Sequence, residues 1–467
     1  MNGRMKHVGL VMIGAFAGVL VSLNFSAQAN KEVAAPLPVE ELRNLAEVFN
    51  AVKSGYVEPV EDKKLITSAI TGMLSGLDPH SAYLDADAFK DLQVGTQGEF
   101  GGLGIEVGME DGFVKVISPI EDTPAFRAGI KAGDLIVKLD ETPVKGMTLN
   151  DAVKRMRGKP RTNITLTIAR KGESKPLVLT LTREVIKVQS VKVKALDEGY
   201  GYIRITQFQD KTAEDVVKQL DKLSKSNSLK GLVLDLRNDP GGLLNGAVGV
   251  AAAFLPPKAL VVSTDGRTED AKRKYLAAPE DYLRGTRDDF IKKLPPEARS
   301  VPMVVLVNAG SASASEIVAG ALQDHKRAVV LGTQTFGKGS VQTILPLANN
   351  AAIKLTTARY YTPNGRSIQA KGIVPDIVVE ESANGSSGTR VREADLDRHL
   401  NNDKESEAKD AAKAAPSKKE SRKDGRKDEG ADDDAPKNFE FGGKGDYQFA
   451  QAVNLLKGLQ IIQTKKP

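Results

Sequence analysis

The sequence predicts an α/β protein in which a smaller, β-rich domain is inserted ahead of a larger domain of alternating strands and helices. Three observations support this prediction. Apolar runs alternate with helix-patterned segments from 185 to 380, glycine-rich short strands fill 95 to 184, and helical periodicity dominates 30 to 94. A chain of 467 residues is long enough for two or three such domains.

The amino-acid composition limits the chemistry that the chain can perform. It has no cysteine, which excludes disulfides, a thiolate nucleophile and cysteine-based metal sites. We expect no metal and no other cofactor. The formal net charge is +6, but the basic residues are interspersed with acidic ones and few aromatics lie among them, so we expect no nucleic-acid partner.

The N-terminus, 1–29, has the pattern of a secretory signal peptide. Basic residues precede an apolar run from Val8 to Phe25, and Ala27 and Ala29 form a small-residue cleavage site. We therefore expect cleavage after Ala29 and a periplasmic location, with retention of the segment as a membrane anchor as the alternative.

The region 30–94 is predicted to be helical. The apolar positions of its first helix alternate spacings of three and four residues: Leu42, Leu45, Phe49, Val52 and Tyr56. This is the spacing of a helix that packs against a partner helix, so we expect dimerisation here; packing within its own domain explains the pattern equally well. A second helix is expected over 64–76.

The region 95–184 is predicted to be a small β-rich domain. We expect strands over 113–117, 135–139 and 164–169, and a helix over 149–156. The segment from Thr123 to Ile136 resembles the central signature of PDZ domains. That resemblance implies a groove that captures a peptide C-terminus by strand addition.

In PDZ domains a glycine-bearing loop supplies N–H groups to the terminal carboxylate of the peptide. Here the corresponding loop is Gly102-Leu103-Gly104, with Ile105 as the first strand residue. The resemblance therefore implies that Leu103, Gly104 and Ile105 bind the substrate C-terminus. A loop without a ligand is the alternative. A dinucleotide fingerprint is not expected, because no helix pattern follows Gly104.

The region 185–380 is predicted to be the main α/β domain. The expected strands are 202–205, 232–236, 304–307, 329–331, 352–361 and 377–379, and the expected helices are 212–223, 243–254 and 317–322. The charged stretch 265–296 is expected to be a surface insertion.

The C-terminal part is predicted to be a tether followed by a helix. Residues 381–443 contain few bulky apolar side chains and many small or charged ones, so we expect a disordered linker. Within 444–467 a helix is expected over 447–462. A helix beyond a flexible tether has no core of its own, so we expect it to dock on another subunit or on a partner, and to contribute to a homo-oligomer in the first case.

A serine-rich turn between the strand 304–307 and the helix that follows is the strongest candidate for a nucleophile. It contains Ser311, Ser313 and Ser315, and spacing alone does not choose among them. A serine needs a base, and histidines are scarce: His325 lies at the polar end of a helix, where a helix-end cation is the simpler interpretation.

A buried lysine is the alternative base. The reference pKa of lysine is about 10.4, so roughly 3 units of depression are needed near neutral pH, and burial in an apolar pocket can supply them. Lys338 stands between Gly337 and Gly339 and is followed by apolar residues, which makes it the candidate in this region.

The serine turn, Asn308 to Glu316, and the lysine segment, Thr335 to Gln342, together resemble the carboxyl-terminal processing (tail-specific) protease family, peptidase family S41. The resemblance extends from Glu40 to Val379 and includes Asp78-Pro79-His80-Ser81 and 235–242. It implies a ClpP/crotonase-like core of ββα units, an inserted PDZ domain and serine endopeptidase activity.

The resemblance also implies the roles of individual residues. They are Ser313 as nucleophile, Lys338 as general base, Gln342 as the hydrogen-bond partner of the lysine amine, and Ala314 and Gly242 as oxyanion-hole donors, with Gly241 as the alternative to Gly242. In some family members an arginine at the end of the PDZ helix reports the bound tail to the core, and Arg157 matches it here. Resting members can hold the lysine misaligned until substrate arrives.

The expected partners are protein substrates with accessible C-terminal tails, drawn from envelope or unfolded proteins, and lipoprotein adaptors such as the family often uses. Two other functions compete. One is a non-catalytic PDZ scaffold. The other is a nucleotide hydrolase, since Gly332-x4-Gly337-Lys338 approaches a P-loop; Gly339 replaces its Ser/Thr, however, and a strand pattern follows instead of a helix.

Overall fold

The computed structural model describes residues 37–120, 122–226, 229–285, 288–382, 391–403 and 440–464. The chain divides into two units, one ending at Ile70 and the other beginning at Thr71. The predicted signal peptide lies outside the described residues. Among the helices that the structure describes, none combines the length and the apolarity needed to span a membrane.

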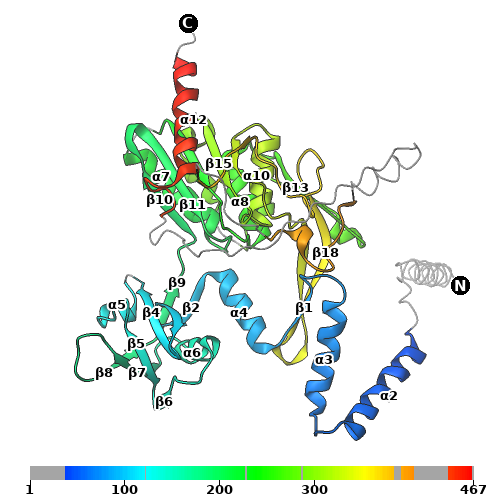
Figure 1. Cartoon of the computed structure of the whole chain (residues 1–467). Helices are drawn as coiled ribbons and strands as arrows, with labels where there is room; N and C mark the ends of the chain where they lie inside the picture. Colours follow the sequence, from blue (N-terminus) through cyan, green and yellow to red (C-terminus); the bar gives the residue numbers. More distant parts are fainter. Residues whose placement is uncertain are drawn as a thin grey trace, which may run out of the picture. The chain divides into compact units, whose positions relative to one another are not determined.

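The first unit contains helix α2 (Val39–Gly55) and most of α3 (Asp62–Ser75) (Figure 1). The helical prediction for this region is confirmed. Acidic Glu40 and Glu41 lie in the first turn of α2 and Lys53 in its last, which suits the helix dipole. Helix α2 buries none of its residues, and its apolar side chains Leu42, Leu45 and Val48 are 46%, 48% and 61% exposed.

The second unit begins with elements that lead into the small β-rich domain. Strand β1 (Ala82–Leu84) precedes helix α4 (Ala86–Gln97). Asp85 caps α4 by accepting a 2.8 Å hydrogen bond from the Ala88 amide, and Gly98 ends the helix with φ 72°.

The small β-rich domain is a six-stranded sheet with the order β3-β4-β5-β7-β8, in which β6 pairs with β5. Its strands are β3 (Ile105–Glu110), β4 (Phe113–Pro119), β5 (Leu135–Leu139), β6 (Thr142–Pro143), β7 (Asn163–Ala169) and β8 (Leu177–Thr182). Helices α5 (Pro124–Arg127) and α6 (Leu149–Met156) accompany it. The predicted strands and helix of this domain are confirmed. Along β7, alternate residues Ile164, Leu166 and Ile168 are buried, as expected for a strand with one face in the core.

A short antiparallel pair joins the β-rich domain to the rest of the chain. Strand β2 (Glu99–Gly102) runs into the domain, strand β9 (Glu184–Lys187) runs out of it, and the two pair from Glu99↔Lys187 to Gly102↔Glu184. The chain therefore enters and leaves this domain at one place.

The main sheet has six strands in the order β10-β11-β12-β15-β16-β19. They are β10 (Val191–Ala195), β11 (Tyr200–Ile205), β12 (Gly231–Asp235), β15 (Met303–Val307), β16 (Val329–Gly332) and β19 (Ile377–Val378). Strands β11 to β19 are parallel, and β10 is antiparallel to β11. Parallel strands of this kind are normally covered on both faces.

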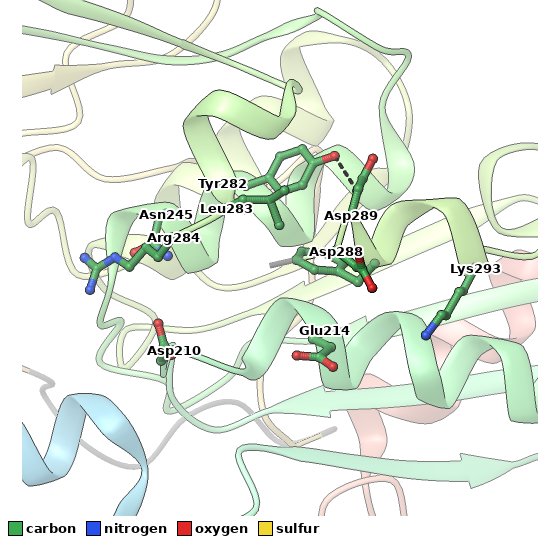
Figure 2. A pocket seen from close by; sticks show the side chains of 10 residues that line it. Asp210, Glu214, Asn245, Tyr282, Leu283, Arg284, Asp288, Asp289 and Lys293 are labelled. Carbon is green, nitrogen blue, oxygen red and sulfur yellow. Dashed lines mark hydrogen bonds between the residues drawn. The ribbon is translucent and has the colours of Figure 1, made fainter. Parts of the chain in front are cut away.

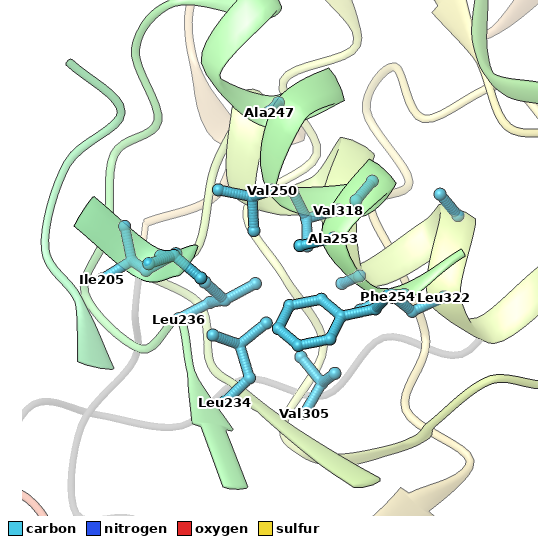
Figure 3. Close-up of a cluster of buried hydrophobic side chains, with 14 of the residues drawn as sticks. Ile205, Leu234, Leu236, Ala247, Val250, Ala253, Phe254, Val305, Val318 and Leu322 are labelled. Atoms are coloured by element: carbon cyan, nitrogen blue, oxygen red, sulfur yellow. The ribbon is translucent and has the colours of Figure 1, made fainter. Parts of the chain in front are cut away.

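One face of the main sheet is covered by α7 (Thr212–Ser226), α8 (Leu244–Phe254) and α10 (Ala314–Asp324). Figure 3 shows part of this core, where Leu234 and Val305 from the strands meet Phe254 and Val318 from the helices. The predicted α/β architecture is confirmed.

The other face of the sheet is covered by α12 (Tyr447–Thr464), drawn in red in Figure 1. Ala452 and Leu456 of α12 pack against Val233, Val304 and Leu306. The expectation that this helix docks on another subunit is therefore wrong for this structure, because it covers the sheet of its own chain. The physical reason is that a parallel sheet has a second apolar face, and α12 buries it.

A second, antiparallel sheet lies beside the main one and has the order β1-β18-β13-β14, with β17 also paired to β18. Its further strands are β13 (Leu260–Gly266), β14 (Arg273–Leu276), β17 (Ser340–Pro346) and β18 (Ala352–Tyr361). The stretch 265–296, expected to be a surface insertion, is partly built into the fold: β14 extends this sheet, and Tyr282 of α9 (Pro279–Tyr282) is buried in the main core.

Part of the predicted linker is ordered. Residues 391–403 include a short 3-10 helix, Glu393–Asp395, and both Glu393 and Asn402 are buried. The expectation of disorder is wrong for this segment and for 440–443, since polar side chains anchor them where apolar ones are few. The remaining linker residues lie outside the described part of the chain.

Candidate active site

Ser313 occupies a strained position at the start of α10. Strand β15 ends at Val307, the chain turns through 308–312, and Ser313 is the N-cap of the helix with φ 56° and ψ −110°. A non-glycine residue in such a conformation costs on the order of 1–3 kcal/mol, and residues of this kind concentrate at functional sites. The turn thus has the strand–turn–helix geometry expected for an exposed nucleophile.

The hydrogen bonds of the turn distinguish its three serines. Ser311 Oγ donates to the Leu236 carbonyl at 2.8 Å, and Ser315 Oγ donates to the Asp239 carbonyl at 3.0 Å. The Ser313 hydroxyl instead lies near the Tyr360 hydroxyl of β18, where it opposes the rise in the pKa of Tyr360 that burial causes. Ser313 is 8% exposed, whereas the other two are fully buried. The hydroxyls of Ser311 and Ser315 are therefore used to hold the backbone, so Ser313 is the remaining candidate for the nucleophile.

A buried carboxylate joins the serine turn to the lysine segment. Glu316 Oε2 accepts hydrogen bonds from the amides of Ser313 at 2.8 Å and Lys338 at 2.9 Å. Its Oε1 accepts from the Gly337 amide at 2.7 Å and the Thr335 hydroxyl at 2.5 Å. Because all four partners donate, the site is built for the ionised carboxylate.

Burial raises the pKa of Glu316 to about 7, and the hydrogen bonds from Thr335 and the three amides oppose that rise. No role for Glu316 was predicted from the sequence. The spacing Ser313-x-x-Glu316 is a capping box, and this was the signal that could have identified it.

Lys338 comes two residues before strand β17, and its amide donates to Glu316. The residue is partly buried. Burial lowers the pKa of Lys338, and the positive charge of Lys354 lowers it further. Glu393, Glu316 and Asp78 act in the opposite direction. The net depression is the direction that a general base requires.

The P-loop alternative does not fit this geometry. The residue after Gly339 begins strand β17, whereas a P-loop leads into a helix. The amides of Gly337 and Lys338 already donate to Glu316, so they are not free to cradle a phosphate.

Gln342 lies in β17, close to the predicted lysine. Its Nε2 donates to Ser340 Oγ at 3.0 Å and to Thr356 Oγ1 at 3.3 Å. Among the described residues, no hydrogen bond joins the Lys338 amine to Gln342 or to Ser313. The expected lysine–glutamine contact is thus not formed in this structure, although the bonds of Nε2 leave Oε1 as the acceptor for it.

The glycine pair after β12 lies against the serine turn. A side-chain carbon on Gly241 would stand 2.9 Å from the Ala314 amide nitrogen, and one on Gly242 would stand 2.1 Å from the Phe208 carbonyl oxygen. Both positions therefore require glycine.

Available N–H groups distinguish the two glycines. The Gly241 amide already donates to Asp239 Oδ1 at 2.8 Å. Within the described part of the chain, the amides of Gly242 and Ala314 donate to no other group. These two amides match the predicted oxyanion-hole donors, and Gly241 does not.

The histidines do not form a Ser-His-Asp triad. His325 is the C-cap of α10, and its Nε2 lies 2.7 Å from the Leu260 carbonyl oxygen. His80 Nε2 lies 2.8 Å from Glu393 Oε2, a buried carboxylate. Both rings are engaged away from the serine turn.

The predicted peptide-binding loop of the β-rich domain is held by hydrogen bonds that its carbonyl groups accept from neighbouring backbone amides. The Leu103 carbonyl accepts from the Ala125 amide at 3.0 Å, and the Gly104 carbonyl accepts from the Ile120 amide at 2.9 Å. Gly104 has φ 76°, which glycine adopts without strain, and Ile105 begins β3 directly after it.

Arg157 ends α6 and connects it to α4 and β2. Its guanidinium carbon lies 4.7 Å from the centre of the Phe100 ring, and its Nη1 lies 3.2 Å from Asp91 Oδ1. These contacts border a pocket of about 290 Å³. Arg157 thus contacts both elements, while its side chain remains 38% exposed.

Figure 2 shows another pocket of about 290 Å³, whose lining includes Asp210, Glu214 and Lys293, and in which the Tyr282 hydroxyl donates to Asp289 at 2.9 Å. None of the predicted site residues lines it. No group of three or more described His, Cys, Asp or Glu residues is arranged to hold a metal ion.

Known protein families match three parts of the chain. Peptidase family S41 matches 199–379, the PDZ domain matches 101–181, and the activating protease CtpB N-terminal domain matches 14–88. The first two matches coincide with the main α/β domain and the β-rich domain.

Individual proteins are also similar over most of their length. The carboxy-terminal-processing protease of Bartonella bacilliformis is 49% identical over 375 residues, which are 79% of this chain and 82% of that protein. The carboxy-terminal processing protease CtpB of Bacillus subtilis is 33% identical over 408 residues, 85% of this chain and 81% of that protein. Among solved structures, a photosystem II D1 C-terminal processing protease is 32% identical, covers 72% of this chain and 86% of its own, and gives a TM-score of 0.41.

The family predicted from the sequence motifs is confirmed by these similarities. Since relatives this similar share most of their length with it, the chain belongs to peptidase family S41, as a carboxy-terminal processing serine peptidase with a PDZ domain.

Proposed function

We propose that the chain is a periplasmic endopeptidase whose catalytic centre is the pair Ser313 and Lys338. The observation that carries this proposal is the Glu316 carboxylate, which accepts hydrogen bonds from the backbone of both residues. Nucleophile and base therefore belong to one buried hydrogen-bonded unit, and the depressed pKa of Lys338 suits a base.

The reaction follows from these groups. The neutral Lys338 amine takes the proton of Ser313 Oγ as this oxygen attacks the scissile carbonyl. The amides of Ala314 and Gly242 stabilise the negative charge that develops on the carbonyl oxygen. The lysine ammonium then gives its proton to the leaving amine. A water molecule, deprotonated by the same lysine, attacks the acyl carbonyl, and the lysine returns that proton to Ser313 Oγ as the serine leaves and the acid product is released.

We further propose that substrate aligns Lys338. Gln342 Oε1 is the acceptor that would hold the amine once it turns toward Ser313, and the existing bonds of Gln342 Nε2 already orient that amide.

The proposed substrates are envelope or unfolded proteins whose C-terminal tails bind the domain 95–184 at Leu103, Gly104 and Ile105. The signal-peptide pattern supports the periplasmic location, and similarity to carboxy-terminal processing proteases supports action near carboxyl termini. A lipoprotein adaptor and a homo-oligomer are compatible with this function; the exposed apolar side chains of α2 support the second.

We propose that Arg157 couples tail binding to catalysis. It bridges α6, which would flank the bound tail, to Phe100 and Asp91 on elements that continue toward the peptidase domain. The change Arg157→Ala should lower kcat for a reporter with a free C-terminal tail. A short internal peptide, which does not use the tail-binding loop, should be cleaved as before.

The decisive experiment compares cleavage of an unfolded reporter by the wild type, Ser313→Ala and Lys338→Ala. Each change should lower kcat by a factor on the order of 10³ or more, because each removes a group that acts in every turnover. Ser315→Ala, a change of the same type in the same turn, is the matched control and should retain most of the activity. Undiminished cleavage by Ser313→Ala or Lys338→Ala would contradict the proposal and leave the PDZ scaffold as the better interpretation.

A further inference from the structure

Residues 391–403, which we name the strap, lie beyond the part of the chain that matches the peptidase family and contact the lysine segment directly. The Glu393 amide donates to the Phe336 carbonyl at 3.0 Å. Arg392 Nε donates to the Thr335 carbonyl at 3.3 Å. The strap is therefore hydrogen-bonded to the backbone that immediately precedes Lys338.

The side chain of Glu393 reaches the backbone on the other side of Lys338. Its Oε1 accepts from Gln369 Nε2 at 2.8 Å, and Gln369 Oε1 accepts from the Gly339 amide at 3.0 Å. Glu393 itself is fully buried, so these bonds form away from competing water. The strap thus holds the lysine segment both before and after the lysine.

Glu393 is also one of the charged groups that act on the Lys338 amine. The anions are Glu393, Glu316 and Asp78, and the cation is Lys354. His80 faces Glu393 from the opposite side, with its Nε2 at 2.8 Å from Glu393 Oε2. A carboxylate so placed affects the lysine in two ways, through the backbone that it anchors and through its charge.

We propose that Glu393 is a positioning residue for Lys338 and acts through Gln369 and through its own negative charge. This inference rests on the proposed role of Lys338 as the base. It assigns a catalytic purpose to a segment outside the matched peptidase domain, where the sequence pattern indicated only a linker.

The test uses the full chain with four variants: Glu393→Ala, Glu393→Gln, Gln369→Ala and Asp395→Asn. Asp395 is the matched control, because it lies on the same 3-10 turn but is exposed, and among the described residues its side chain accepts only from the Arg392 amide. Each variant is assayed for kcat and KM on an unfolded reporter from pH 6 to about 10, spanning the range over which a depressed lysine titrates. Thermal unfolding checks that it folds.

Glu393→Ala should lower kcat by a factor of about 10 to 100 with little change in KM, since a misplaced base costs that much. Gln369→Ala should lower kcat without moving the pH profile, because it breaks the anchor but removes no charge. Glu393→Gln keeps an acceptor for Gln369 but removes a negative neighbour. The lysine ammonium is then less stabilised, so the acidic limb of kcat/KM should move to lower pH.

Wild-type kcat and an unmoved acidic limb in Glu393→Gln would overturn the inference, as would equal effects of Glu393→Gln and Asp395→Asn. Should Glu393→Ala not fold, Glu393→Gln and Gln369→Ala decide the question. Ser313→Ala and Lys338→Ala are run in parallel, and activity in either would mean that the proposed function has failed rather than the role of the strap.

Discussion

Single residues of the catalytic region differ in how far the sequence could identify them. The motifs pointed to Ser313 and Lys338, but only the structure showed that Ser311 and Ser315 donate to backbone carbonyls. Glu393 could not be found at all, because its partners Gln369 and His80 are 24 and 313 residues away in the chain. Contacts that depend on the path of the chain leave no local pattern.

The charge of Lys354 gives a prediction for the pH dependence of activity. Burial is the largest cause of the lowered pKa of Lys338, and the positive charge of Lys354 on β18 is the second largest. Without it the Lys338 ammonium is less disfavoured, so its pKa rises. Lys354→Gln should therefore move the acidic limb of kcat/KM to higher pH and reduce activity near neutrality.

The control for that prediction is Lys274→Gln, an equal loss of charge on exposed strand β14 of the same sheet. The charged groups that perturb the Lys338 amine most are Lys354, Glu393, Glu316 and Asp78, and Lys274 is not one of them. Its pH profile should match that of the wild type. A shift of the same size in both variants would mean that overall charge, and not Lys354 itself, sets the profile.

At the scale of elements, periodicity predicted what depends on local sequence. The helices 149–156 and 243–254 and the strand 232–236 lie within a residue or so of α6, α8 and β12. What periodicity could not give was the partner of each element. Helix α12 was predicted as a helix but assigned to another subunit, since the apolar second face of the main sheet is visible only after the strands are assembled.

A buried ion pair attaches the segment before α12 to the main sheet. Arg237 is 2% exposed, and its guanidinium donates to both oxygens of Asp446 at 2.8 and 2.5 Å and to Asp235. Its charge also lies over the ring of Phe441, 5.0 Å from the centre. Removing one partner leaves the other charge buried and unpaired, which costs about 3–5 kcal/mol.

Asp446→Asn should therefore lower the free energy of unfolding by about 3 kcal/mol, measured by denaturant titration at neutral pH. Burial alone would raise the pKa of Asp446, but the hydrogen bonds and charge of Arg237 outweigh it and hold the pKa below 3.8. The stabilisation is thus present above the ordinary aspartate value and is lost as the pH falls through the lowered one. The difference between variant and wild type should shrink below about pH 4.

Lys457→Ala supplies the comparison on the same helix. Lys457 pairs with Glu198 at 3.1 Å, but these side chains are 42% and 61% exposed. An exposed pair contributes about 0–1 kcal/mol, so this variant should stay close to the wild type. If Lys457→Ala lowered the free energy of unfolding as much as Asp446→Asn does, the effect would not be specific to the buried ion pair.

At the scale of the whole molecule, the exposed apolar face of α2 predicts self-association. Leu42 and Leu45 of the predicted stripe are about half exposed, and no residue of α2 is buried by the part of the chain that the structure describes. A second copy of the same helix would cover this face with the heptad spacing that the sequence shows. Light scattering should report a dimer or larger species for the wild type.

Leu42→Lys with Leu45→Lys should shift that species toward the monomer, because charged side chains oppose burial of the face. Arg43→Ala, a change on the same helix outside the apolar stripe, should leave the mass unchanged. A wild type that is monomeric at every concentration would contradict the prediction.

The β2–β9 pair makes the PDZ domain a separable part of the chain. Because Gly102 lies opposite Glu184, the two ends of the PDZ domain are adjacent and a tight turn could connect them directly. The PDZ domain could thus be removed, or exchanged for a domain of different peptide specificity, while the peptidase domain keeps its own chain path. Such grafting offers a way to retarget the enzyme without redesigning its chemistry.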